Sequence, residues 1–235
     1  MAEHSANAPI VFTWAGVRAG IRRSLPLAVS VFAYGLVFGV LARQAGLGLL
    51  ESLLMSGLVY AGSSQFVALG LWQTPLPVLA IIFTTFVVNI RHLLMGAALG
   101  PWFARLSVPK TYGSLFFMAD ENWALTMREF AAGGRDAAFL LGSGLPLFVA
   151  WLSATAVGGT VATAFPNPAR LGLDFAFTAT FIALLVGMWQ GKASLVPWIV
   201  AALVALVTAQ WLPSQWYILL GGLAGSVTGA IYNAE

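Results

Sequence analysis

Long stretches without charge are the feature of this sequence that most restricts its fold. Residues 52–104 contain one formal charge, Arg91, and residues 137–234 contain three. Apolar runs of about 18 residues or more are typical of transmembrane helices, because lipid leaves backbone N–H and C=O groups to be paired within the helix. The whole chain is 8% charged, whereas soluble domains are about 25% charged. We therefore expect an all-helical integral membrane protein.

Seven apolar segments have the length of a membrane span, and an eighth is interrupted by charge. The seven are residues 25–42, 52–72, 76–101, 138–163, 171–190, 194–211 and 215–232. The eighth, residues 112–127, contains the charged stretch "MADENW". We expect seven or eight transmembrane helices, some of them broken by polar residues.

Basic residues predict which side of the membrane each end faces. Arg18, Arg22 and Arg23 precede the first span, and short basic flanks stay in the cytoplasm. We expect a multi-pass protein of the cell (inner) membrane with a cytoplasmic N-terminus. The connection 104–136 is also basic, which conflicts with three straight crossings before it. Either 76–101 does not cross as one straight helix, or the "MADENW" segment crosses too.

The two halves of the chain resemble each other. "LPLAVSVFAYGLVFGVLA" at 25–42 matches "LPLFVAWLSATAVGGTVA" at 145–162, and three shorter matches follow in the same order. The shorter pairs are 47–49 with 171–173, 71–73 with 188–190, and 93–100 with 218–225. Repeated halves with broken helices are common in secondary transporters, which bind substrate between the repeats. We expect an internal twofold repeat.

This repeat divides the chain into four parts. They are a cytoplasmic N-terminal segment (1–24), a first membrane repeat (25–105), a polar or amphipathic connection with an acidic motif (106–143) and a second membrane repeat (144–235).

Polar residues interrupt the second apolar segment in "AGSSQF". Gly62 can relax the helix, and Ser63, Ser64 and Gln65 place hydroxyl and amide groups at membrane depth. Such groups often only bond a neighbouring helix. Alternatively they bind substrate at a break in the helix, where free backbone N–H groups are available.

A second polar cluster, Asn89, Arg91 and His92, follows a long apolar run. A charge deep in a membrane is costly and usually faces a cavity or a partner, which makes Arg91 a candidate substrate ligand. It could bind a carboxylate or tie two broken segments together. The alternative is that the helix ends here and Arg91 reaches the headgroups.

The adjacent acids Asp120 and Glu121 lie between aromatic and aliphatic residues. Desolvation and a like-charged neighbour both favour a protonated carboxyl, which a proton-coupling site needs. His92 is the third candidate for that role. The alternative is an amphipathic interfacial helix with its acids in water.

Several classes of protein are disfavoured. The chain has no cysteine, so neither a disulfide framework nor a thiolate metal site is possible. Its net charge of +3 is too small and scattered to predict nucleic-acid binding. "GMWQGKAS" at 187–194 lacks the spacing and the hydroxyl residue of a phosphate-binding loop. An intramembrane serine protease would need a glycine-flanked nucleophile that is missing. We expect no enzyme activity, metal or cofactor; a channel or a scaffold subunit is the alternative to a carrier.

Three motifs, "AGSSQF", "NIRHLLMGAALGP" and "MADENWAL", follow a "P…YGLVFG" first helix and together resemble the AzlC family of branched-chain amino-acid exporters. The resemblance covers residues 20–130 in motifs and is weaker beyond. One departure is Ala119, where the family often has a hydroxyl residue. The positions that match are Gly62, Ser63, Gln65, Asn89, Arg91, His92, Pro101, Asp120 and Glu121.

The resemblance implies a secondary transporter that exports branched-chain or other small hydrophobic amino acids. It also implies a small membrane subunit of the AzlD type as partner. Coupling to the proton-motive force, with Asp120, Glu121 or His92 taking up the proton, is our expectation from the polar groups that interrupt three apolar segments.

Overall fold

The computed structural model describes residues 9–164, 195–212 and 216–232, with the single positions 182, 186, 189 and 191. Its helices are α1 (Trp14–Gln44), α2 (Leu49–Val59), α3 (Gly62–Gly70), α4 (Val78–Asn89), α5 (Arg91–Ala98), α6 (Gly100–Phe103), α7 (Val108–Phe116), α8 (Asp120–Ala131), α9 (Ala138–Ala164), α11 (Leu195–Trp211) and α12 (Trp216–Tyr232). The expected all-helical class is confirmed for these residues, in which the only β feature is one isolated bridge.

Three helical stretches of the described residues are long and apolar enough to cross a membrane. They are Trp14–Gln44, Val78–Ala98 and Ala138–Ala162. Helices α11 and α12, with 17 residues each, coincide with two more expected spans. The expected span 171–190 lies outside the described residues except at three positions, so the count of seven or eight stays a prediction.

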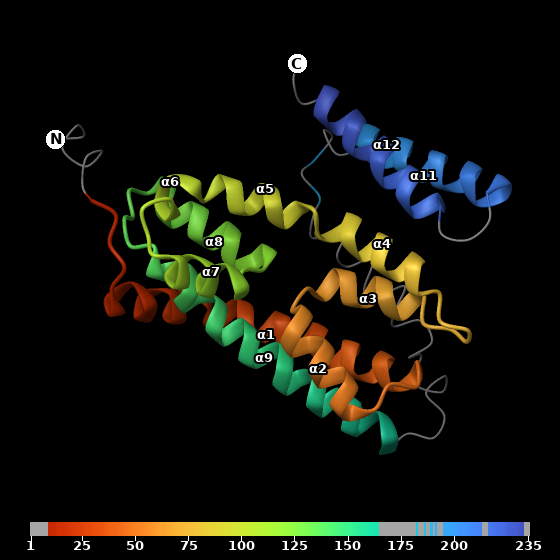
Figure 1. Cartoon of the computed structure of the whole chain (residues 1–235), viewed down its shortest axis with the longest axis horizontal. Coiled ribbons are helices and arrows are strands. Elements are labelled where there is room, and N and C mark those ends of the chain that lie inside the picture. Colours follow the sequence, from red (N-terminus) through yellow and green to blue (C-terminus); the bar gives the residue numbers. More distant parts are fainter. Residues whose placement is uncertain are drawn as a thin grey trace.

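Helices α1 and α9 pack side by side and run in the same direction (Figure 1). A Cβ at Gly20 would overlap the backbone of Phe139, and one at Gly39 would overlap the backbone of Thr155. Residues further along α1 therefore contact residues further along α9, as in a parallel pair. Glycines at such an interface let two backbones approach closely. Because parallel spans enter from the same side, the chain between them must cross back an odd number of times.

Helices α2 and α3 form a hairpin that does not cross. The expected single span 52–72 is wrong in this respect, because the backbone breaks at Tyr60, which is left-handed (φ 42°). Leu49 lies beside Gly159 and Gly57 beside Leu152, so α2 runs back along α9. With 11 residues it is roughly 16 Å long, about half of the hydrocarbon core. In Figure 1, α3 then turns outward again.

Helices α7 and α8 form a second hairpin that enters from the opposite end (Figure 1). The ring of Phe117, at its tip, lies 5.1 Å from that of Phe148 in the middle of α9. Glu129, near the end of α8, pairs with Arg23 in the first third of α1. Residues 112–127 are thus two short helices, and the possible eighth span is not a single crossing.

This arrangement removes the conflict over the basic connection. One crossing, Val78–Ala98, separates α1 from α9, and the hairpins add none. The connection 104–136 lies at the same end as the N-terminus: Lys110 sits over the ring of Phe12 at 5.2 Å, and Val11 donates to the carbonyl of Arg135 at 3.0 Å.

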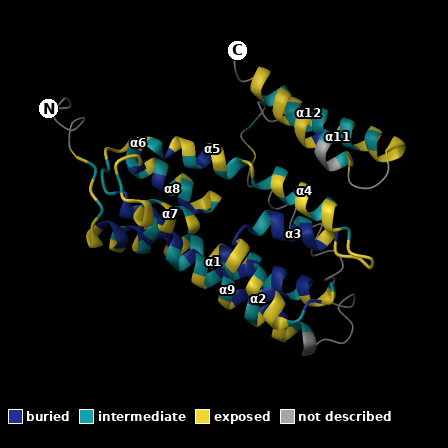
Figure 2. Cartoon of the chain, viewed as in Figure 1, coloured by how far each residue is buried: buried dark blue, intermediate teal, exposed yellow. Residues whose placement is uncertain are grey.

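Burial differs sharply between the core formed by α1, α3 and α9 and the exposed helix α4 (Figure 2). Buried residues gather where α1, α3 and α9 meet, around Phe38, Phe66 and Trp151. Helix α4 exposes large apolar side chains such as Leu79 and Phe86. An apolar exposed face is what a helix in contact with lipid requires.

The internal repeat stays a prediction. Its longest match, 25–42 with 145–162, lies in the parallel helices α1 and α9, each of which has an internal proline, Pro26 and Pro146. The matches at 171–173 and 188–190 lie outside the described residues, apart from position 189.

Candidate functional site

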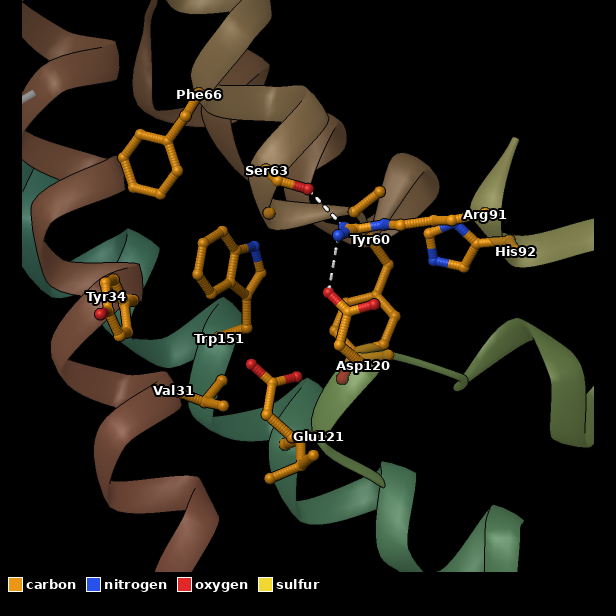
Figure 3. A pocket seen from close by; sticks show the side chains of 14 residues that line it. Val31, Tyr34, Tyr60, Ser63, Phe66, Arg91, His92, Asp120, Glu121 and Trp151 are labelled. Carbon is orange, nitrogen blue, oxygen red and sulfur yellow. Dashed lines mark hydrogen bonds and ion pairs between the residues drawn. The ribbon is translucent and has the colours of Figure 1, made fainter. Parts of the chain in front are cut away.

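The tips of the two hairpins meet at a cavity of about 420 Å³ in the middle of the bundle. Figure 3 shows it between α1, α9 and the two tips. Its size falls within the range of about 300–1,000 Å³ that is usual for small-molecule sites. The lining residues are Val31, Tyr34, Tyr60, Ala61, Gly62, Ser63, Phe66, Arg91, His92, Ala119, Asp120, Glu121, Leu147 and Trp151.

Arg91 joins the two hairpins. It is the first residue of α5, directly after the joint at Ile90. One guanidinium nitrogen donates to the hydroxyl of Ser63 on α3. Another lies 2.9 Å from a carboxylate oxygen of Asp120 on α8 (Figure 3). A single cation at the start of α5 therefore links the first turn of α3 to the first turn of α8.

The two neighbouring acids have different surroundings. Asp120 is paired with Arg91, whereas Glu121 has no basic side chain within ion-pair distance among the described residues. Figure 3 shows the Glu121 carboxylate pointing into the cavity, toward Trp151. The cavity thus has one neutralised acid and one without a counter-charge.

Three predicted residues lie behind the cavity and do not line it. Ser64 accepts a hydrogen bond from the amide of Asn89 (3.1 Å), and Gln65 donates to Ser56 (3.4 Å). Ser56 is bonded in turn to Thr155 of α9 at 2.9 Å. These bonds fix α3 against α4, α2 and α9, which is the structural role that buried serine and glutamine often have in membranes.

Two helix N-termini point toward the cavity from opposite sides. Helix α3 begins at Gly62, and its cap residue, Ala61, provides no side-chain hydrogen bond. Helix α8 begins at Asp120, and the side chain of Asn122 accepts from the N–H of Ala119 at 2.7 Å. The first N–H groups of a helix have no intrahelical acceptor and carry partial positive charge. An uncapped α3 therefore offers donors to an anion.

Aromatic side chains form the apolar wall. Trp151 stacks on Phe38 with 5.6 Å between ring centroids, and Phe66 meets both rings edge to face. Val31 and Leu147 complete this side of the cavity. The wall accepts an apolar group and excludes a charged one.

The cavity contains six of the nine predicted site residues. They are Gly62, Ser63, Arg91, His92, Asp120 and Glu121. His92 is bonded through Nδ1 to the carbonyl of Asn89 at 3.2 Å. Pro101, which the family resemblance adds, lies in α6 away from the cavity lining.

Sequence reasoning missed Tyr60, Trp151 and Asn122. Tyr60 immediately precedes the "AGSSQF" motif, so its position at a break could have been found there. Asn122 directly follows the two acids and could have been identified as a capping residue at the N3 position. Trp151 lies in an unbroken apolar run, and no local signal distinguishes it from a residue that faces lipid.

In the described part of the chain, no group of three or more histidine and acidic side chains is placed to hold a metal ion. The chemistry available is that of charge and hydrogen bonding. The lining combines one cation, Arg91, and the two acids Asp120 and Glu121 with an aromatic wall, an arrangement suited to a small molecule that has both charges and an apolar group.

Known proteins resemble this chain over most of its length. It is 25% identical to the "Branched-chain amino acid transport protein AzlC" of Bacillus subtilis, over 75% of this chain and 69% of that protein. It is 28% identical to the "Inner membrane protein YgaZ" of Escherichia coli, over 92% and 89%. An "Uncharacterized membrane protein" of Archaeoglobus fulgidus is 29% identical over 74% and 77%. No solved structure matches.

The family comparison covers more than half of the chain. The family described as "AzlC protein" matches residues 26–165, which include α2 to α9 and the part of α1 from residue 26 onward. Every residue that lines the cavity falls within this match. This chain is therefore a membrane protein of the AzlC family.

Proposed function

We propose that this protein is a secondary transporter that exports branched-chain or other small hydrophobic amino acids. The observation that carries the proposal is the central cavity, where Arg91, Asp120 and Glu121 face an apolar aromatic wall. A zwitterion with an apolar side chain needs a cationic group, an anionic group and such a wall. The name of the Bacillus subtilis relative supports the same class of substrate.

The cavity's position between two opposed hairpins supports alternating access. One hairpin enters from each end of the bundle, so each separates the cavity from one side of the membrane (Figure 1). Broken helices around a central site are the general plan of secondary transporters. In this proposal the two hairpins are the gates, and Arg91 links them because it bonds to both tips.

Proton coupling is assigned to the acids of the cavity, with His92 as a further candidate. Glu121 is favoured over Asp120, because Asp120 is already neutralised by Arg91. A carboxyl that takes a proton loses its attraction for a substrate ammonium group. Proton and substrate would then replace one another at the cavity, which yields exchange driven by the proton-motive force.

A small AzlD-type membrane subunit is the proposed partner.

We also propose that the protein lies in the inner membrane with its N-terminus in the cytoplasm. Arg18, Arg22 and Arg23 lie at the same end as the basic connection 104–136. This clustering at one end supports the orientation through the preference of short basic flanks for the cytoplasm.

Efflux from whole cells tests this proposal. Cells are preloaded with radiolabelled leucine, valine or methionine, with the chain expressed alone or with its small partner, and the proton gradient is then collapsed. We expect efflux that needs both the partner and the gradient. Absence of efflux for all three amino acids with the partner present would contradict the proposed function.

A further inference from the structure

Trp151 has an unused hydrogen-bond donor at the cavity. The residue is only 6% exposed, and its indole N–H has no partner among the described residues. Figure 3 shows this nitrogen on the side of the ring that faces Ser63 and Arg91. A buried polar group without a partner is costly, so such a group in a binding cavity points to a missing ligand atom.

The surrounding donors are those that a carboxylate needs. The six-membered ring of Trp151 lies over the start of α3: a Cβ at Gly62 would be 3.1 Å from its Cη2 atom. The uncapped N-terminus of α3, nine residues long, is therefore beside the indole. The Nε of Arg91 is a second buried donor without a partner. All three features stand on one side of the cavity.

We propose that this side is a carboxylate subsite, in which the indole N–H of Trp151 donates to the substrate together with the first N–H groups of α3. The ammonium group then lies on Glu121, the acid that has no basic partner. This assignment rests on the proposed function and deepens it: the substrate must carry both charges of an α-amino acid.

The stacking of Trp151 allows its donor to be removed while an aromatic ring is kept in the wall. Phenylalanine in its place keeps an aromatic ring against Phe38 and Phe66 and lacks only the N–H and part of the ring. Trp102 offers a matched control, because its ring stacks on Phe130 at 4.4 Å outside the cavity.

Competition binding tests the assignment. The full-length chain in lipid nanodiscs binds radiolabelled leucine, which is displaced by unlabelled leucine, by isopentylamine (leucine without its carboxylate) or by isocaproate (leucine without its ammonium). W151F should weaken leucine binding roughly tenfold or more, as expected for a lost hydrogen bond to a charged group. Its affinity for isopentylamine should stay unchanged, and W102F should change neither.

Glu121→Gln provides the mirror experiment. It should weaken leucine and isopentylamine by similar factors and leave isocaproate binding unchanged or stronger. Glu129→Gln, at the far end of the same helix, serves as its control and should affect no ligand.

The outcomes distinguish failure of the carboxylate subsite from failure of the proposed function. Equal weakening of leucine and isopentylamine by W151F, or unchanged leucine binding, overturns the carboxylate subsite. Equal affinity of the wild-type chain for leucine and isopentylamine overturns it without any variant. A wild-type chain that binds no leucine even when its small partner is present in the same nanodisc contradicts the proposed function itself.

Discussion

Arg91 and Asp120 form an ion pair, with 2.9 Å between guanidinium nitrogen and carboxylate oxygen, although they belong to helices that approach the cavity from different directions. Arg91 also donates to Ser63, so one side chain bonds to both hairpin tips. Both members of the pair are partly exposed, and such a pair adds little to stability. The main effect of the pair is to position the two hairpin tips relative to each other.

Replacing Arg91 with lysine should disrupt transport while the fold survives. Lysine keeps the charge but lacks the planar fork that reaches Ser63 and Asp120 together. We expect leucine efflux to fall roughly tenfold or more, as for the loss of a hydrogen bond to a charged group. Radiolabelled efflux measures the change.

Arg23→Lys is the matched control for this variant. Arg23 pairs with Glu129 away from the cavity, so efflux should stay at the wild-type rate. Wild-type efflux by R91K would contradict the role of Arg91 as the link between the tips.

The parallel contact of α1 and α9 predicts where a single methyl group destabilises the protein. A Cβ at Gly142 would overlap the backbone of Val17, which cannot move aside easily. Gly142→Ala should cost about 1–3 kcal/mol, as overpacking usually does. The melting temperature of the protein in detergent measures this loss.

Gly96→Ala is the control, because nothing lies within 4 Å of its added Cβ. Alanine is also the better helix former, so the melting temperature should stay equal or rise. Equal melting temperatures for both variants would rule out the close α1–α9 contact.

The size of the apolar wall should set the preferred side chain. Val31 lines the cavity and is 8% exposed. Val31→Ala removes two methyl groups, so export of phenylalanine should rise severalfold relative to leucine, in line with the roughly 10–200-fold effect of one methylene in a tight pocket. The ratio of the two efflux rates is the measurement.

Val29 lies on the same helix but is 72% exposed. Val29→Ala should leave the ratio of phenylalanine to leucine unchanged. A similar shift in both variants would mean that the selectivity does not come from the cavity wall.

Glu121 should make export depend on the proton gradient. Glutamine cannot take up a proton, so E121Q should release leucine at saturating internal concentration with or without the gradient. Glu129→Gln should keep the dependence. If efflux by E121Q still stops when the gradient is collapsed, the coupling proton binds elsewhere, and His92 and Asp120 are tested next.

Much of the helical fold was predictable from the sequence. The expected spans at 25–42 and 138–163 coincide with parts of α1 and α9, because uncharged apolar runs leave few other structures in lipid. Helix α1 begins earlier, at Trp14, because Thr13 caps it and Asp136 holds that cap. Arg18 and Arg22 therefore lie within the helix.

The hairpins could not be predicted from hydropathy. Residues 52–72 are as apolar as a true span, and the break at Tyr60 depends on its contact with Phe148, at 5.0 Å, and on the network around Ser56. The meeting of Arg91 with Asp120 depends on the opposite entry of the two hairpins. Such contacts are set by packing between distant segments, and hydrophobic periodicity does not encode them.

Leucine efflux from proteoliposomes that contain the chain and its small partner shows directly whether the cavity is the transport site, when the cavity is either left open or filled by a substitution. Gly62→Trp places a large ring against Trp151 in the cavity, and Gly96→Trp places one where the structure leaves open space. We predict that G62W, extracted in detergent and monodisperse like the wild type, exports no leucine, while G96W exports at the wild-type rate. Leucine export by G62W at the wild-type rate would contradict the assignment of this cavity as the transport site.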